Sequence, residues 1–99
     1  MSLQGFAFVS KRVSENRQPV RFMYREQGEQ PEDSGWRFFS GDETDEYANN
    51  PDNITINAVS TVIQIDPDVA KHLDSPFGSA FERNSSSEPF TKSDWTTPE

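Results

Sequence analysis

Alternating hydrophobic and polar positions near the start of the chain predict two β-strands. Segment 5–11 is rich in aromatic and β-branched residues, which is typical of a strand. Segment 19–25 alternates with a period of two and predicts a second strand, with Val20, Phe22 and Tyr24 on one face and Arg21, Met23 and Arg25 on the other. Because segment 14–18 between them has the composition of a turn, we expect the two strands to pair as an antiparallel hairpin.

Segment 36–40 predicts a third strand. Adjacent strand residues point to opposite faces, so Trp36 and Phe38 share one face while Arg37 and Phe39 share the other. We expect Trp36 and Phe38 to fill the core. Phe39 is then either covered by a helix or partly exposed. Arg37 is expected to pair with one of the acids that follow this strand.

Segment 54–65 is compatible with both a helix and a strand. From Val59 onward, hydrophobic residues recur at helical spacing, whereas the frequent β-branched residues favour a strand. We expect a helix over about 57–64, with Asn57 as its N-cap residue. The residues just before this segment favour a turn, with a single helical turn around Tyr47.

Two further signals complete the predicted elements. Asp66 and Pro67 predict the start of a short helix, with Asp66 as N-cap and Pro67 at the first helical position. Segment 77–83 alternates again and predicts a fourth strand. We therefore expect one α+β domain over residues 1–84, a small curved mainly antiparallel sheet of four to five strands with two short helices. Residues 85–99 are polar and Ser-rich and predict a flexible C-terminal tail.

The composition narrows the class of protein. Ninety-nine residues suit a single domain, and although only 31% are hydrophobic, 12% are aromatic, which predicts a small aromatic core. The absence of cysteine excludes disulfides and thiolate metal sites and fits the reducing cytoplasm, where we expect the protein to act. No apolar run approaches the roughly 20 residues that span a bilayer, so no membrane partner is expected.

Acidic residues are concentrated in the middle of the chain. The formal net charge is −8, and residues 26–53 contain nine acids against one arginine. Residues 1–25, by contrast, contain five basic residues and one acid. An acidic surface repels nucleic acid and anionic lipid and attracts cationic proteins. The charge pattern therefore predicts a protein partner and argues against nucleic acid and membranes.

Little in the sequence would support catalysis. Catalysis needs titratable groups of complementary role, and the chain has no cysteine and a single histidine, His72. The Gly-x-Ser-x-Gly and phosphate-loop motifs are absent, and segment 42–53 lacks the spacing of an EF-hand loop. We predict no catalytic residue, no metal site and no cofactor, so we do not expect an enzyme.

The sequence feature that most clearly indicates a binding function is an aromatic strand that leads directly into acidic residues. Burial of each aromatic ring contributes about 1.5–3 kcal/mol, whereas an unpaired buried carboxylate costs several kcal/mol. Segment 36–39 should therefore be anchored in the core while the following carboxylates stay in water. We call residues 42–47 the acidic loop. We expect it to bind a cationic partner through Asp42, Glu43, Asp45, Glu46 and Tyr47.

Four motifs give a family resemblance. They are Tyr24-Arg25-Glu26, Asp33-Ser34-Gly35-Trp36-Arg37-Phe38-Phe39-Ser40-Gly41-Asp42-Glu43, Asp66-Pro67 and Phe77-Gly78-Ser79-Ala80-Phe81-Glu82-Arg83. In their order and spacing the chain resembles bacterial immunity protein family thirty-three, formerly a domain-of-unknown-function family, from about residue 6 to residue 83. The motif residues that we expect to be structural are Gly35, Trp36, Arg37, Phe38, Phe39, Gly41, Asp66, Pro67, Gly78, Phe81 and Arg83.

The resemblance implies a small α+β bacterial protein of the cytoplasm that acts by binding rather than by turnover. Such proteins belong to polymorphic toxin systems, in which a cell makes an inhibitor of its own secreted toxin. We therefore expect a toxin-neutralising immunity protein that binds a cationic toxin domain, such as a nuclease, stoichiometrically through its acidic surface. The alternative is a cytoplasmic protein-interaction or regulatory domain unrelated to toxins.

Overall fold

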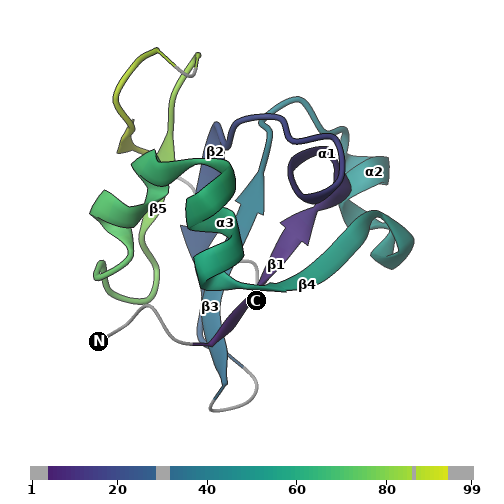
Figure 1. The fold of residues 1–99 in the computed structure, drawn as a ribbon, viewed down its shortest axis with the longest axis horizontal. Helices are drawn as coiled ribbons and strands as arrows, with labels where there is room; N and C mark the ends of the chain where they lie inside the picture. The colour runs from purple at the N-terminus through teal and green to yellow at the C-terminus, as the bar shows by residue number, and fades with distance from the viewer. Residues whose placement is uncertain (1–4, 29–31, 86, 94–99) are drawn as a thin grey trace.

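The described residues form a six-stranded sheet with short helices packed against it (Figure 1). The structure, a computed structural model, describes residues 5–28, 32–85 and 87–93. The strands are β1 (Phe6–Ser10), β2 (Phe22–Arg25), β3 (Asp33–Phe39), β4 (Ile54–Ala58), β5 (Ala80–Glu82) and β6 (Thr91–Lys92). The α-helices are α1 (Lys11–Ser14), α2 (Asp45–Asn49) and α3 (Val59–Ile65), and the 3₁₀ helices are η1 (Pro51–Asn53) and η2 (Pro67–His72).

The strand order is β4-β1-β3-β2-β5-β6, which places β3 near the middle of the sheet. Six of the seven β3 residues are buried, as expected for a strand with a neighbour on each side. Phe38 lies in register with Val9 of β1 and with Met23 of β2. β1 and β3 are parallel and the other pairs are antiparallel, so the sheet is mixed and mostly antiparallel. The predicted α+β class is confirmed.

The predicted hairpin of the first two strands is wrong, because β3 lies between β1 and β2. The chain enters α1 directly after β1, where the Ser10 side chain accepts a hydrogen bond from the Arg12 backbone N–H at 3.2 Å. Val13 of α1 is fully buried, so the chain turns into the core instead of folding back along β1. The position beside β1 is instead occupied by β3, whose aromatic rings add buried surface to the core.

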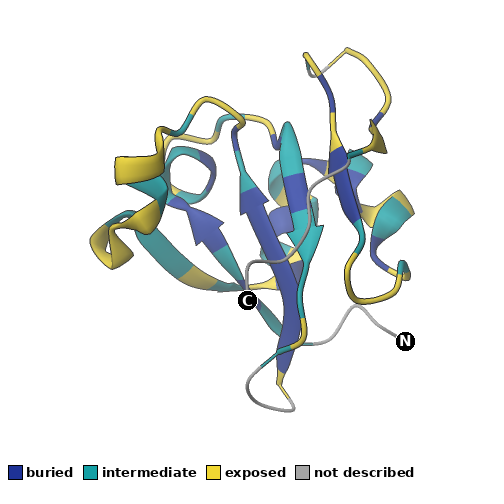
Figure 2. Cartoon of the chain, turned by 180° about the vertical axis from the view of Figure 1, so that it is seen from behind, coloured by how far each residue is buried: buried dark blue, intermediate teal, exposed yellow. Residues whose placement is uncertain are grey.

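The hydrophobic core lies between the sheet and the helices α1, α3 and η2. Trp36 and Phe38 are 1% and 0% exposed, which confirms their predicted shared face. Their rings stack with centroids 6.0 Å apart, and the Trp36 indole N–H donates to the Leu73 carbonyl oxygen at 3.2 Å. Figure 2 shows the central strands from the opposite side, with α3 behind them. The indole bond thus ties the central strand to the end of η2.

The ambiguous segment 54–65 contains both predicted alternatives, one after the other. Its first part forms β4, which pairs with β1, and its second part forms α3. The helix begins at Val59, and the predicted N-cap at Asn57 is wrong because Asn57 lies within β4. Ala58 occupies the cap position without a side-chain hydrogen bond. Pairing with β1 therefore overrides the local helical preference of residues 57 and 58.

Asp66 and Pro67 begin a helix as predicted, although η2 is a 3₁₀ helix. The Asp66 carboxylate accepts hydrogen bonds from the Asp68 and Val20 backbone N–H groups at 3.2 and 3.0 Å. It also forms a buried ion pair with Arg83, whose Nε donates to the Val20 carbonyl oxygen at 3.0 Å. These bonds join η2 to the residues that flank β2 and β5.

The segment after residue 84 continues the sheet through β6, which pairs with β5. Phe90 is 9% exposed and belongs to the core cluster, with the Arg83 guanidinium 4.2 Å from its ring centre. Trp95, the other aromatic residue of the predicted tail, lies outside the described residues. Among the described residues, no helix has the length and hydrophobicity needed to cross a membrane.

Candidate functional site

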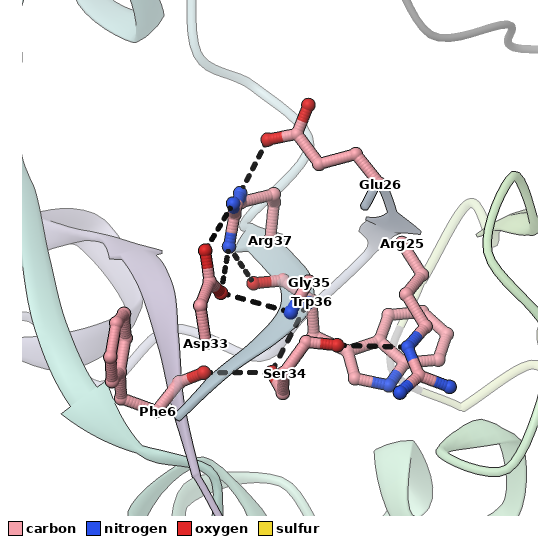
Figure 3. A network of polar contacts seen from close by, with 8 residues as sticks. All are labelled: Phe6, Arg25, Glu26, Asp33, Ser34, Gly35, Trp36 and Arg37. Atoms are coloured by element: carbon pink, nitrogen blue, oxygen red, sulfur yellow. Dashed lines mark hydrogen bonds and ion pairs between the residues drawn. The ribbon is translucent and has the colours of Figure 1, made fainter. Parts of the chain in front are cut away.

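Arg37 lies at the centre of a buried polar network on β3 (Figure 3). Its two terminal nitrogens donate to the two Asp33 carboxylate oxygens at 2.9 and 3.0 Å, and its Nε donates to Glu26 at 2.6 Å. Burial alone would lower the pKa of Arg37, but the hydrogen bonds and the negative charges of Asp33 and Glu26 together outweigh burial and raise the pKa. Arg37 therefore stays charged at any physiological pH.

The prediction that Arg37 pairs with an acid after its own strand is wrong. The register of β3 against β1 shifts here, since Phe6 pairs with Asp33 and Phe8 with Arg37, so four residues of β3 lie opposite two of β1 and the Asp33 carboxylate comes within reach of Arg37. Gly35 lies between them with φ of +86°, and a Cβ there would overlap the Glu26 carbonyl oxygen. The absence of a side chain at Gly35 lets the Glu26 backbone approach β3 closely enough for its carboxylate to reach Arg37.

Two acids of the acidic loop fold back onto the chain. The Glu43 carboxylate accepts hydrogen bonds from the Ser40 and Gly41 backbone N–H groups at 2.8 and 2.9 Å. Asp42 accepts a hydrogen bond from the Ser40 hydroxyl and one from Arg12 at 3.3 Å. The Ser40 bond, with a smaller contribution from Arg12, lowers the pKa of Asp42. These two carboxylates hold the turn after β3, which the sequence reading did not anticipate.

The other two acids lie on the surface, where Asp42 is also exposed. Asp45 and Glu46 are exposed in the first turn of α2, where a carboxylate is favourable beside the free backbone N–H groups. Thr44 caps this helix by accepting a hydrogen bond from the Tyr47 backbone N–H at 3.1 Å. The Tyr47 ring is half-buried, with the Arg12 guanidinium 4.7 Å from its centre. Tyr47 is thus fixed against the domain beside the two displayed carboxylates.

A shallow groove of about 370 Å³ lies beside the acidic loop. Its aromatic wall consists of Phe22 and Tyr24 from β2 and Phe39 from β3, and the Tyr24 and Phe39 rings stack with centroids 6.0 Å apart. Glu43 and Asp45 line the side nearer α2. Phe39 is half-buried, in agreement with the partial exposure allowed by the sequence. Carboxylates beside aromatic rings suit the binding of a cationic side chain.

His72 is half-buried at the edge of the core and packs against two aromatic rings. Its ring stacks on Phe81 with centroids 4.3 Å apart and meets Phe90 edge-on at 5.5 Å. Burial, and secondarily the charge of Lys71, lowers the pKa of His72, so the ring is neutral at pH 7. In the described part of the chain, no three His, Cys, Asp or Glu side chains gather as metal ligands would. His72 therefore has a packing role, and the acidic loop and the aromatic groove are the surfaces suited to binding.

The stretch from Gly35 to Glu43 contributes buried rings to the core, the Arg37 network and the hydrogen bonds that hold the turn after β3. Comparisons of the chain with curated proteins and with solved structures found no match. The family model of the immunity protein Imm33 domain, by contrast, matches residues 7–94, and thus extends past Arg83 through β6. Immunity proteins of this kind are typically non-enzymatic binders whose partner is a cognate toxin. The chain belongs to the Imm33 immunity protein family, which implies a role in toxin neutralisation.

Proposed function

We propose that this protein neutralises its cognate toxin by forming a stoichiometric complex in which the acidic loop binds a cationic surface of the toxin. The observation that supports this most directly is that the four acids of the loop differ in their contacts. Asp42 and Glu43 are hydrogen-bonded to the turn, although Asp42 stays exposed, whereas Asp45 and Glu46 are exposed on a capped helix. The backbone that carries Asp45 and Glu46 is therefore held in place before the partner arrives.

Such preorganisation favours binding in two ways. Ordering a flexible side chain or loop on association costs about 0.5–1.5 kcal/mol per side chain, and part of this cost is already met here by folding. Opposite charges also steer the encounter, which raises association rate constants from about 10⁵–10⁶ M⁻¹s⁻¹ toward 10⁸ M⁻¹s⁻¹ at low salt. An inhibitor that must reach its toxin before damage occurs benefits from this speed. Tyr47 and the aromatic groove would supply contact area around the charges.

The test is co-expression in a sensitive bacterial strain. Each toxin domain encoded in the native genome of this protein is induced with and without the immunity gene, growth is followed, and native mass spectrometry gives the stoichiometry of any complex. We expect rescue from one toxin domain and a complex of defined stoichiometry. The charge reversal Asp45→Lys/Glu46→Lys should weaken binding by about tenfold or more, with a loss that is largest at low salt.

The matched control is Glu82→Lys/Glu88→Lys, which makes the same change in net charge at exposed positions near β5 and β6. This control should leave the affinity within about twofold of the wild type. Equal losses from both double variants would indicate that net charge alone governs binding and would contradict a specific acidic loop. Failure of the wild-type protein to protect against every toxin domain of that genome would refute the proposed function.

A further inference from the structure

A second groove, of about 530 Å³, lies on the other side of α2 and has a largely apolar lining. Its floor includes Phe8 of β1 and Ile56 of β4, which are register partners and therefore neighbours on one sheet face. Ile56 is 65% exposed, an unusual exposure for a large aliphatic side chain at the edge of a sheet. The lining residues are Phe8, Ala48, Asn49, Pro51, Ile54 and Ile56.

The groove is built on fixed elements. The Arg37 guanidinium lies 4.0 Å from the centre of the Phe8 ring, and Asp33 and Glu26 hold that guanidinium in place. On the opposite wall, the Asn53 side-chain amide donates to the Tyr47 carbonyl oxygen at 3.2 Å and joins η1 to α2. A partner therefore meets a preformed surface and does not have to order it.

The charges carried by the two helices that wall this groove are acidic, and Arg12, the cation that lies against the Tyr47 ring of α2, is ion-paired with Asp42. Residues 38–70, which include α2, η1 and β4, contain no lysine and no arginine. The two helices that wall the groove hold Asp45, Glu46 and Asp52 at exposed positions. Arg37, the cation in contact with the floor, is only 3% exposed and is paired with two carboxylates. The lining itself carries no charge, and the acids lie on the helices beside it, so the groove with its surroundings is complementary to an apolar side chain flanked by lysine or arginine.

We propose that this groove receives a cationic amphipathic segment of the toxin, whose apolar side chain seats against Ile56 and Phe8 while its flanking cations meet the acids of α2 and η1. This inference rests on the proposed function and extends it, because the acids speed the encounter while the apolar contact determines the lifetime of the complex. A second copy of this chain fits poorly, since each copy has a net charge of −8 and would bring acidic rims together.

The four isoleucines of the chain allow binding in the groove to be detected by NMR. Ile54 and Ile56 line the groove, whereas Ile63 and Ile65 of α3 pack against the core. The full-length protein, labelled with ¹³C at the isoleucine methyl groups, is titrated with a catalytically inactive form of the toxin domain found by co-expression. We expect the Ile54 and Ile56 methyl resonances to shift and those of Ile63 and Ile65 to stay within a much smaller range.

Substitution of Ile56 gives a second, quantitative readout. Ile56→Lys places a cation in the groove and should raise the Kd for the toxin domain about tenfold or more, and Ile56→Thr, which keeps the β-branched shape, should act in the same direction. The matched control is Phe77→Lys, because Phe77 is also a large exposed hydrophobic residue, at 57%, and lies before β5. The control should change the Kd by less than about twofold, and thermal melting verifies that all variants are folded.

The outcomes separate the two proposals. If the Ile54 and Ile56 resonances do not respond, or if Ile56→Lys binds normally while Asp45→Lys/Glu46→Lys does not, the groove inference is overturned and the proposed function stands. If the wild type neutralises no toxin domain, both fall together. If the groove methyl resonances change with the protein's own concentration, or on removal of residues 94–99, the occupant is a second copy or the chain's own end, and the inference is overturned.

Discussion

Asp33 and Arg37 lie four residues apart on one face of β3, and the Asp33 carboxylate accepts two hydrogen bonds from the Arg37 guanidinium, at 2.9 and 3.0 Å. Their side chains are 2% and 3% exposed. A buried charge is tolerated only while its partner is present. Because the same guanidinium lies over Phe8, this pair connects the middle of the sheet to the apolar groove beside α2.

Asp33→Asn should be strongly destabilising. The substitution removes the charge that compensates Arg37 while keeping nearly the same volume, so it leaves a buried cation with Glu26 alone. We expect the free energy of unfolding in urea to fall by about 3–5 kcal/mol. Asp45→Asn makes the same chemical change at an exposed position and should cost no more than about 0.5 kcal/mol. Similar small losses at both positions would contradict the assigned role of the pair.

Glu43 should matter for folding and Glu46 should not. Glu43→Ala removes the acceptor for the Ser40 and Gly41 backbone N–H groups, in a partly exposed turn, and should cost about 1–2 kcal/mol of unfolding free energy. Glu46→Ala removes an exposed carboxylate and should cost less than about 0.5 kcal/mol. Chemical denaturation of the two variants side by side provides the comparison. Equal stability would show that Glu43 does not hold the turn.

Alanine substitutions at Gly35 and Gly78 separate the cost of an unfavourable backbone conformation from the cost of a steric overlap. Both have positive φ, at +86° and +92°, so alanine at either position should cost about 1–2 kcal/mol for the backbone conformation. Only at Gly35 does an added Cβ overlap another atom, the Glu26 carbonyl oxygen, whereas nothing lies within 4 Å of it at Gly78. Gly35→Ala should therefore lose about 1–3 kcal/mol more than Gly78→Ala, measured as a difference in unfolding free energy.

Because of His72, the folded protein should be less stable in mild acid than at neutral pH. Burial lowers its pKa in the folded protein below the ordinary value of 6.5, so the unfolded chain binds the proton more readily. The stabilisation due to His72 is complete above pH 6.5 and is lost as the pH falls toward the lowered folded-state pKa. Unfolding curves at pH 7.5 and 5.5 should show this decline in the wild type and a smaller decline in His72→Phe. An equal decline in both proteins would assign the pH dependence to other groups.

Many elements of the fold follow from local patterns in the sequence. Aromatic and β-branched residues in segments 5–11 and 36–40 and the period of two in segment 19–25 indicate strands that overlap β1, β3 and β2, and Trp36 and Phe38 identify the core face. Such signals are visible in the sequence because alternation and helix capping depend on residues within a few positions of one another. The four motifs, of which the stretch from Gly35 to Glu43 is the most specific part, indicate the family that the family model confirms.

The tertiary structure alone decided which segments meet. The pairing of β1 with β3, the choice of Asp33 and Glu26 as partners of Arg37, and the return of Glu43 to the Ser40 backbone all depend on distances in space. A carboxylate in the sequence has the same charge whether it binds its own backbone or faces solvent. Only folding distinguishes the two, because the cost of burying a charge depends on the hydrogen bonds that the fold brings within reach.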